Sequence, residues 1–414
     1  MKTLLQINPV LRVSTSTGRI MQEIGELAMR YGWESYMAYG RGRDAILPCR
    51  SRLSPVGGLL STSWHGLQTR LMERHGLASV GATKRFIRQI ERIRPDVVHI
   101  HNIHGYFLNY RILFDYLSHS DIPVIWTVHD CWLYTGHCYH YSFAGCEKWQ
   151  TGCDHCPQQG EFPSSLLFDR SRRNFRDKRA AFTSMPKDRL ILVPVSEWMK
   201  SEMRKSFLGE YDLQVIHNGI DTDAFHVCEP QAARSKYGLG DRHILLGVAG
   251  IWSREKGLDD FLQMASLLHE DEVIVLVGVN PREKKQLPRN IVGITRTGNI
   301  RQLAELYSAA DVFVNPTLQD NYPTVNMEAI ACGTPVATYR TGGSIETVTE
   351  QTGRIVAQGD VEGLLEAVRD LYRQGREGYR ASCREYALKH FNKKDRYADY
   401  LRLYDELSAG NRRE

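Results

Sequence analysis

The sequence predicts an α/β protein with two doubly wound parallel sheets, each covered by helices on both faces. Three observations lead to this prediction. Short runs of Val, Ile and Leu recur along the chain, as in strands that are buried on both faces. Most are followed by a polar turn and a segment with helical spacing of apolar residues. The alternation restarts near 215–218, so the 414 residues are expected to form two such domains.

The first half is expected to begin with a strand at 3–7, a polar loop at 8–18 and a helix with apolar residues at 20, 24, 27 and 28. A second strand is expected at 35–39. The stretch 48–80 is rich in Gly, Ser and Arg and is expected to be irregular. A helix at 84–94 ends before a proline, and strands follow at 97–100, 123–128 and 190–195.

The second half repeats the pattern, with strands at 244–249, 273–279 and 312–314 and helices at 257–268, 300–309 and 324–332. Helices are expected from about 361 to 407. The expected domains are an N-terminal one at 1–212, a C-terminal one at 213–390, and a last helix at 391–414 that packs back on the first. Ligands of open parallel sheets bind at the carboxyl ends of the strands. The two domains are therefore expected to face each other across a ligand-binding cleft.

Composition excludes several classes of protein. Hydrophobic residues make up 42% of the chain and charged residues 24%, which is ordinary for a globular protein and unlike a disordered one. No run approaches the ~18 apolar residues of a membrane span. The N-terminus turns polar too early for a signal peptide, so a cytoplasmic protein is expected.

The net charge of +5 is unevenly distributed, with +9 in residues 1–195 and −4 in 196–414. A basic first half could face anionic lipid or a diphosphate-linked acceptor, although simple solubility is the alternative. Acidic residues interrupt every basic stretch, so no nucleic acid partner is expected. Peripheral contact with the inner face of the plasma membrane is consistent with this charge.

A candidate phosphate loop runs from Gly250 to Gly257, after a strand and before a helix. Backbone N–H groups at the start of a helix attract anions. Arg254 and Lys256 add positive charge that could hold a diphosphate and stabilise a departing phosphate. The alternative is a helix start with two solvated basic residues, and this segment alone does not decide between them.

Two carboxylates, Asp320 and Glu328, flank the start of the helix at 324–332. They can face one cleft at different depths and accept hydrogen bonds from the hydroxyls of a sugar or a ribose. The N–H groups of 322–325 could meet a phosphate between them. Taken singly, each acid is more simply explained as a charge that complements the helix dipole.

In combination these motifs resemble those of the retaining glycosyltransferases of family 4, which have the GT-B fold of two Rossmann-like domains. The family's mark of two Glu separated by seven residues is matched by Asp320 and Glu328, followed by Ala329–Val336. Its Gly-Gly turn ending in Glu resembles Thr341–Val348, and its interdomain Asn-Gly-Ile-Asp motif resembles Ile216–Asp221. Lys256–Gly257 resembles its basic phosphate loop. The resemblance covers nearly the whole chain and is strongest over about 215–353. The Cys-rich insert at 131–160 and the run Asp320–Pro323 resemble those of bacterial exopolysaccharide or colanic-acid-type transferases.

The resemblance implies roles for residues of this sequence. Lys256, together with Arg254, would hold the donor diphosphate, and Glu328 would bind the ribose hydroxyls. Asp320 would bind the transferred sugar, and His129, at the end of the strand at 123–128, would contact that sugar near the reacting carbon. The implied catalytic residues are His129, Arg254, Lys256 and Asp320. The implied donor-binding residues also include Gly18, Gly250, Asn321, Tyr322, Pro323, Thr324, Val325 and Glu328. No catalytic metal is expected.

Two positions depart from the family pattern. Asp320 replaces a Glu and is one methylene shorter, so its sugar contact is expected to shift. Ile251 stands where the family has an Arg directly after the loop glycine. Arg254 is the candidate to take over the phosphate role of that missing Arg.

Other polar residues at the strand ends of the first domain are candidates for the acceptor site. They are His101, His104 and Asp130. Side chains at the carboxyl edge of a parallel sheet point into its cleft. The alternative is that they are simply polar residues that end a strand.

Four cysteines, Cys138, Cys146, Cys153 and Cys156, lie in a Cys-rich insert at 131–160. Four thiolates that end in a Cys-x2-Cys pair suit a tetrahedral site, most simply a structural zinc. Free thiols are the alternative, and disulfides would require an oxidising compartment.

The expected function is transfer of a sugar from a UDP- or GDP-sugar to a saccharide acceptor by a hexosyltransferase. The expected acceptor is a lipid-linked oligosaccharide of exopolysaccharide or cell-surface polysaccharide synthesis. The alternatives are a GT-B enzyme on soluble substrates, such as a sugar-phosphate synthase or an epimerase, and a catalytically silent nucleotide-sugar-binding protein.

Overall fold

The computed structural model describes residues 1–12, 16–41 and 49–410. The chain divides into two compact units. The first comprises Met1–Ile216 and the C-terminal stretch from Tyr397, and the second comprises His217–Arg396. Each is an α/β domain with one wholly parallel sheet, so the predicted fold class is confirmed. Within the described part of the chain, no helix is both long and apolar enough to cross a bilayer.

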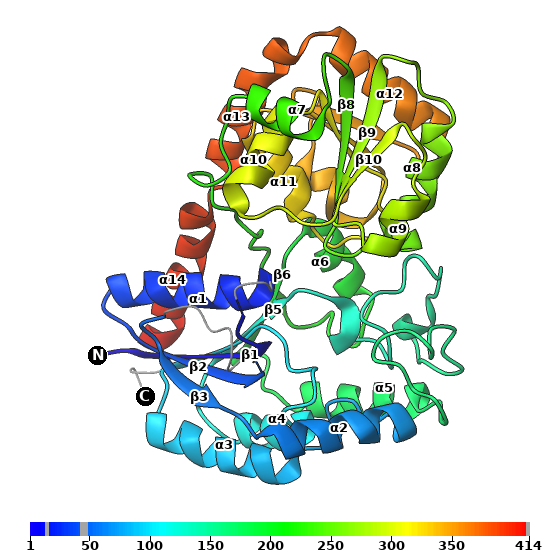
Figure 1. Cartoon of the computed structure of the whole chain (residues 1–414). Coiled ribbons are helices and arrows are strands. Elements are labelled where there is room, and N and C mark those ends of the chain that lie inside the picture. The colour runs from blue at the N-terminus through cyan, green and yellow to red at the C-terminus, as the bar shows by residue number, and fades with distance from the viewer. Residues whose placement is uncertain (13–15, 42–48, 411–414) are drawn as a thin grey trace. The chain divides into compact units, whose positions relative to one another are not determined.

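The first domain contains a seven-stranded sheet of order β3-β2-β1-β4-β5-β6-β7 (Figure 1). Its strands are β1 (Thr3–Val10), β2 (Glu34–Arg41), β3 (Arg52–Pro55), β4 (Val97–Ile100), β5 (Val124–Val128), β6 (Leu190–Pro194) and β7 (Asp212–Leu213). Strand β1 is longer than expected, and part of the loop predicted at 8–18, residues 13–15, lies outside the described residues.

Helices cover both faces of this sheet. The helices α2 (Leu59–Met72), α3 (Val80–Ile93), α4 (Tyr110–Ser118) and α5 (Ser171–Phe182) lie on one face, and α1 (Ser16–Arg30) lies on the other (Figure 1). The helix α6 (Glu197–Arg204) follows β6. Residues from Tyr397 onward in α14 (Lys393–Gly410) join α1 in a core in which Ile20 and Ile24 pack with Tyr400 and Tyr404. Burial of these large side chains fixes α1 and the chain end against the sheet.

The prediction that 48–80 is irregular is wrong, because this stretch contains β3 and α2. Helix α2 buries two polar residues, His65 and Thr69, and exposes its large apolar ones. A pattern search that looks for a buried apolar stripe therefore finds no helix here.

The second domain contains a six-stranded sheet of order β10-β9-β8-β11-β12-β13 (Figure 1). Its strands are β8 (His243–Val248), β9 (Glu272–Val277), β10 (Ile291–Ile294), β11 (Val312–Asn315), β12 (Val336–Tyr339) and β13 (Gly353–Val356). Its helices are α7 (Gln231–Tyr237), α8 (Leu258–Ala265), α9 (Pro281–Gln286), α10 (Ile300–Ala309), α11 (Thr324–Ala331), α12 (Val361–Arg373) and α13 (Arg376–His390).

Candidate functional site

The candidate phosphate loop of the second domain touches the acidic loop that follows β11. The Lys256 Nζ lies 2.8 Å from the Asp320 Oδ2. Gly257 brings the two loops together, because its φ of 74° suits glycine and a Cβ there would collide with the carbonyl oxygen of Pro316. The structure thus places the two charged residues singled out from separate motifs in direct contact.

Asp320 is held by its neighbours on both sides. The N–H of Tyr322 donates to Asp320 Oδ1 at 3.2 Å, and the N–H of Gly343 donates to the Asp320 carbonyl at 3.1 Å. Gly342, with a φ of 48°, passes so close to that carbonyl that any side chain would collide with it. The Gly-Gly turn therefore supports the acidic loop, and His217 stacks on Tyr322 with ring centroids 4.7 Å apart.

Helix α11 begins directly after this loop. Its N-cap residue is Pro323, which offers no capping side chain to the N–H groups of the first turn, where Thr324 and Val325 lie. Glu328 follows one turn later and is buried. The Tyr307 hydroxyl, from α10, donates to the Glu328 Oε2 at 3.1 Å. An uncapped helix start beside Lys256 favours an anion, and a fixed carboxylate favours hydroxyl groups.

Two supporting residues of this site were missed by the sequence analysis. One is Tyr307, the partner of Glu328. The other is Asn326, which accepts from the Asn315 side chain at 2.8 Å and donates to Thr347 Oγ1 at 2.9 Å. These bonds tie α11 to the end of β11 and to the Gly-Gly turn. An Asn inside a helix of mainly apolar residues is the signal that could have revealed it, because buried amides need partners.

Other predicted donor-site residues lie in more exposed places or in the other domain. Arg254 has 77% of its side chain exposed and lies 3.8 Å from Asp259. Ile251 is 81% exposed, and a Cβ at Gly250 would meet no atom within 4 Å. Gly18 lies in the first domain, buried in the first turn of α1.

The histidines of the first domain form a second cluster at the ends of β4 and β5. His101 is buried, with its Nε2 3.0 Å from Gln6 Oε1 and its Nδ1 3.3 Å from the Nε2 of His129. His99 lies two residues before His101 in the sequence. Its Nδ1 is 2.6 Å from the Tyr404 hydroxyl and its Nε2 is 2.7 Å from Thr127 Oγ1. His99 is thus buried in contacts with Tyr404 and Thr127, whereas His101 contacts His129 and holds its ring in place.

These histidines are held neutral. Burial, together with the neighbouring His104, lowers the pKa of His129 to about 4. Burial, with His99 and His129 beside it, also lowers the pKa of His101. A neutral imidazole carries one donor and one acceptor nitrogen. One ring of the His101–His129 pair can therefore donate to the other, and His129 keeps a polar, uncharged nitrogen that could bond to a ligand.

The remaining acceptor candidates, His104 and Asp130, are also in contact. The His104 Nε2 lies 3.3 Å from the Asp130 Oδ2, while the Asp130 Oδ1 accepts from the N–H of Trp132 at 3.0 Å. His104, His129 and Asp130 line one small pocket together with Trp126 and Trp132. Three of the four histidine and aspartate candidates of this domain thus meet at one place.

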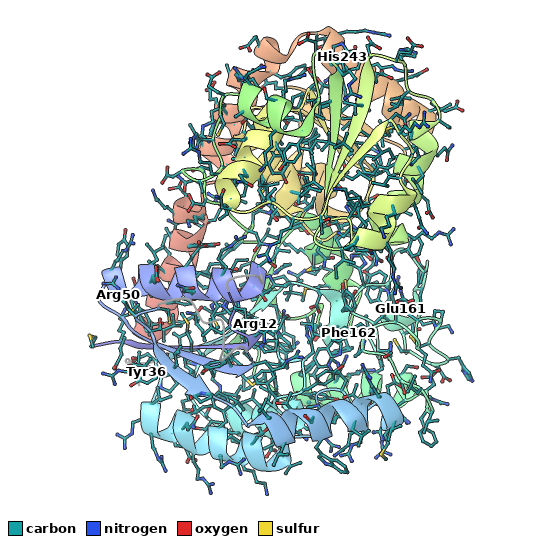
Figure 2. All side chains as sticks on the ribbon, viewed as in Figure 1. Arg12, Tyr36, Arg50, Glu161, Phe162 and His243 are labelled. Atoms are coloured by element: carbon teal, nitrogen blue, oxygen red, sulfur yellow. The ribbon has the colours of Figure 1, made fainter. Side chains whose placement is uncertain are left out.

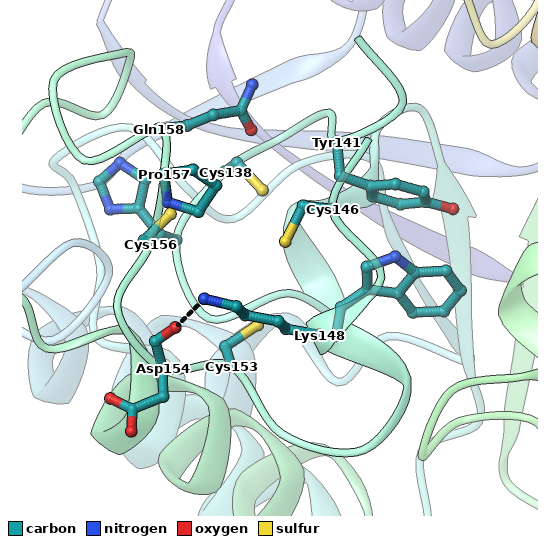
Figure 3. A pocket seen from close by; sticks show the side chains of 11 residues that line it. Cys138, Tyr141, Cys146, Lys148, Cys153, Asp154, Cys156, Pro157 and Gln158 are labelled. Atoms are coloured by element: carbon teal, nitrogen blue, oxygen red, sulfur yellow. Dashed lines mark hydrogen bonds between the residues drawn. The ribbon is translucent and has the colours of Figure 1, made fainter. Parts of the chain in front are cut away.

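The four cysteines predicted to bind zinc, out of five in the insert, line a single pocket together with Lys148 and His137 (Figure 3). All four are free thiols. A hydrogen bond from the Cys138 thiol lowers the pKa of Cys156 to about 7, and the same bond raises the pKa of Cys138. The N–H of Gly136 donates to the Cys153 sulfur at 3.1 Å.

The structure does not support the predicted zinc site. Within the described ranges, no group of three or more His, Cys, Asp or Glu side chains is arranged to hold a metal ion. The Cys153 sulfur accepts from a backbone N–H, and the Cys138 and Cys156 thiols are hydrogen-bonded to each other. The Lys148 ammonium lines the same pocket and donates to the carbonyls of Asp154 and His155 at 2.9 and 3.0 Å. A fixed cation at the pocket disfavours a second cation there.

Two family models match this chain. Residues 63–224 match the model described as glycosyltransferase family 4. Residues 242–374 match the model described as glycosyl transferases group 1. Together they cover the greater part of both domains.

Whole proteins are also similar to this chain, one in sequence and others in fold. The chain is 24% identical over 382 residues to WcaC of Escherichia coli (strain K12), described as a colanic acid biosynthesis glycosyl transferase, covering 88% of this chain and 89% of that one. Sucrose-phosphate synthase of Thermosynechococcus elongatus has a similar fold, with a TM-score of 0.73, 16% identity and coverage of 99% and 100% of the two chains. Anabaena Alr3699/HepE, solved in complex with UDP, follows at a TM-score of 0.66 and 12% identity, with coverage of 98% and 100%.

Proposed function

This chain belongs to family 4 of the glycosyltransferases, and from that premise we propose that it transfers a sugar from a UDP- or GDP-sugar to a saccharide acceptor with retention of configuration. It is a hexosyltransferase with the GT-B fold. The observation that carries the proposal is the 2.8 Å contact between Lys256 and Asp320 beside the start of α11. It unites a diphosphate-binding cation, a sugar-binding carboxylate and a helix N-terminus in one domain.

In the proposed donor complex, Glu328 binds the ribose hydroxyls while Tyr307 keeps its carboxylate in place. The diphosphate lies between Lys256 and the N–H groups of Thr324 and Val325. Asp320, with the backbone of Asn321 and Tyr322, binds the hydroxyls of the transferred sugar. Arg254 adds charge at the diphosphate in place of the family's loop arginine.

The proposed reaction depends on positioning and electrostatics. The bond between the anomeric carbon and the phosphate oxygen breaks as Lys256 and the start of α11 stabilise the charge that develops on the diphosphate. The acceptor oxygen then bonds to the same face of the anomeric carbon. Its proton passes to the leaving phosphate oxygen, so the step needs no further base.

His129 is proposed to contact the transferred sugar near the reacting carbon. Support comes from its low pKa of about 4, which keeps the imidazole uncharged at neutral pH. An uncharged ring avoids repulsion with the positive charge that develops on the sugar. His101, at 3.3 Å, orients the His129 ring. The pocket of His104 and Asp130 is proposed to bind acceptor hydroxyls.

We further propose that the acceptor is a lipid-linked oligosaccharide of exopolysaccharide or cell-surface polysaccharide synthesis. The similarity to WcaC over most of both chains supports this. The excess of basic residues in 1–195 also suits a diphosphate-linked acceptor at an anionic membrane surface. In this proposal the protein acts from the cytoplasm.

The first experiment is a thermal-shift screen of the purified chain against UDP-, GDP-, ADP- and CMP-sugars. A ligand at 100 times its Kd adds ~2.7 kcal/mol to the stability of the state that binds it. We expect a shift with UDP- or GDP-sugars only. A folded protein that responds to neither would contradict the proposed donor site.

Transfer is then measured with the donor so identified and a lipid-linked saccharide acceptor. We expect His129→Ala to abolish transfer while the donor-induced shift persists. The matched control is His155→Ala, because the His155 side chain is 89% exposed and lies in the Cys-rich insert. Transfer by His129→Ala at the wild-type rate would remove His129 from the mechanism.

A further inference from the structure

Helix α2 of the first domain presents apolar residues to solvent and polar residues to the protein. Leu59, Leu60 and Trp64 are 86%, 90% and 59% exposed, and Leu67 and Leu71 are exposed further along the same helix. Its buried residues are His65 and Thr69. This is the reverse of the usual arrangement in a surface helix.

Hydrogen bonds fix the helix in this orientation. His65 lies with its Nδ1 2.9 Å from Ser79 Oγ, and its Nε2 accepts from the N–H of Gly76 at 3.1 Å. Thr69 Oγ1 donates to the His65 carbonyl at 3.0 Å. Rolling α2 to bury its leucines would break the two bonds of His65 to Ser79 and Gly76, so the leucines stay outward.

A second apolar segment adjoins α2. Leu166, Leu167 and Phe168 are consecutive and all exposed. The N–H of Leu166 donates to the carbonyl of Arg70, on α2, at 2.7 Å. The exposed apolar residues of α2 and those of 166–168 together form a surface that we call the apolar face. Contiguous exposed apolar surface of this kind marks an interaction site.

The charges around the apolar face are mainly positive. Helix α2 contains no acidic residue, and its Arg70 is exposed. Arg173 is exposed at the start of α5, and the Asn174 side chain joins this helix to the end of α2 by donating to the Glu73 carbonyl at 3.0 Å. Of the acids between 161 and 177, Asp177 lies 3.8 Å from the Arg170 guanidinium, Asp169 accepts from the N–H groups of Ser171 and Cys156 at 2.8 and 2.7 Å, and Glu161 is exposed.

We propose that the apolar face is the docking surface of this protein for an anionic phospholipid bilayer. Leu, Phe and Trp side chains insert at the boundary between headgroups and acyl chains, and arginines around them bind lipid phosphates. A second copy of this chain fits less well, because a two-fold interface on this face would bring the arginines of each copy toward those of the other.

A chain of ring contacts links the candidate acceptor pocket to Phe162, which lies four residues before the 166–168 segment of the apolar face. Phe162, labelled in Figure 2, is exposed and contacts His75, with ring centroids 5.8 Å apart. His75 in turn contacts His104 and Trp132, which line the pocket, at 5.9 and 5.6 Å. Resting on the proposed function, these ring contacts connect the pocket to an exposed residue four positions before the 166–168 segment of the apolar face, where the saccharide of a lipid-linked acceptor would be presented.

The test is co-sedimentation of the full chain with vesicles of phosphatidylglycerol and phosphatidylcholine, compared with vesicles of phosphatidylcholine alone. We expect binding to the anionic vesicles only. Replacing Leu59→Ser, Leu60→Ser and Trp64→Gln together should weaken that binding by about tenfold or more, because three apolar anchors are lost. The control variant, Ile300→Ser with Leu388→Ser, removes apolar residues that are 46% and 43% exposed in the second domain and should bind as wild type does.

A charge variant tests the second part of the proposal. Arg70→Gln with Arg173→Gln should weaken binding to anionic vesicles and reduce its salt dependence. The control, Arg282→Gln with Lys285→Gln, removes two exposed charges from α9 and should leave binding unchanged.

These outcomes separate the surface from the proposed function. All four variants should keep the donor-induced thermal shift and transfer to a soluble saccharide. Wild-type protein that does not bind anionic vesicles but still shows the donor shift would overturn the docking surface and leave the function standing. Dimers in solution that dissociate in the Leu59, Leu60 and Trp64 variant would overturn it too, because the face would then be an interface between copies.

Discussion

The ammonium of Lys256 and the carboxylate of Asp320 lie 2.8 Å apart and join the loops after β8 and β11. These residues are 64 positions apart in the sequence, so only the parallel order of β8 and β11 in the sheet brings them together. Both side chains keep contact with solvent, with 41% and 18% exposed. The pair is therefore placed to exchange its mutual contact for contacts to a ligand.

Lys256→Ala should reduce kcat for transfer by about 100-fold or more, because the variant lacks the charge that we propose stabilises the leaving diphosphate. Stability should change by less than about 1 kcal/mol, since a half-exposed ion pair contributes little. Steady-state kinetics and urea unfolding measure the two effects. Arg254→Ala, in the same loop but 77% exposed, should cost less activity than Lys256→Ala. Equal activity of Lys256→Ala and wild type would contradict the role of Lys256.

Tyr307→Phe should raise KM for the nucleotide-sugar by about fivefold to tenfold, the effect of one lost hydrogen bond of ~1 kcal/mol to the carboxylate of Glu328. The matched control is Tyr372→Phe. Its hydroxyl donates to Glu272 at 2.7 Å in the same domain, away from the candidate donor site. Both variants lose a tyrosine–glutamate bond, so a change in KM shared by both would show that Glu328 has no special role.

Acid should destabilise the first domain through its buried histidines. Burial lowers the pKa of His99 to about 3 and of His129 to about 4, whereas both should titrate near 6.5 in the unfolded chain. The unfolded state therefore binds more protons between pH 6.5 and about 4, and stability falls as pH falls through that window. Each histidine should account for about 2 kcal/mol between pH 7 and pH 5.

The loss of stability on acidification is measured by urea unfolding of wild type and His129→Asn at pH 7 and pH 5. The variant should lose about 2 kcal/mol less than wild type on acidification. His155→Asn, at an exposed position, should follow the wild type. The same loss in His129→Asn as in wild type would show that His129 does not resist protonation.

Lys178, buried on α5, should make the stability of the first domain rise with pH above neutrality. Its ammonium donates to the carbonyls of Trp132 and Thr135 at 2.6 and 2.9 Å, and burial lowers its pKa to about 7. The lysine pKa in the unfolded chain is near 10.4, so above pH 7 the unfolded state keeps the Lys178 proton while the folded state loses it. The unfolded state therefore binds more protons, and stability rises with pH. Stability should increase by about 1.5 kcal/mol more between pH 7 and pH 8.5 in wild type than in Lys178→Met.

The control for this comparison is Arg179→Met, which changes an exposed neighbour on the same helix. It should keep the wild-type dependence on pH, because Lys178 is intact. Urea unfolding at the two pH values gives the differences. Identical pH dependence in wild type and Lys178→Met would mean that Lys178 stays charged in the folded protein.

Periodicity and motif spacing predicted the two parallel-sheet domains and the family, because both depend on patterns that repeat locally. Buried strands read as runs of Val, Ile and Leu whatever surrounds them, as in β4 and β9. The pairing of Asp320 with Glu328 across the start of α11 is likewise a matter of spacing within one loop and one helix. These features needed no knowledge of which segments meet.

What the sequence left open depends on contacts between distant segments. Helix α2 escaped detection because its polar residues His65 and Thr69 are buried against partners such as Ser79, which no local pattern reveals. The zinc prediction relied on the spacing of the cysteines alone, but the fold gives Cys153 a backbone partner and brings Lys148 to the same pocket. Tyr307 reaches Glu328 only because α10 packs beside α11. Local sequence thus determined the strands, helices and motifs. The tertiary structure decided which side chains are partners and which face of α2 meets solvent. The reason is that the free energies of burial and of pairing depend on everything that surrounds a residue.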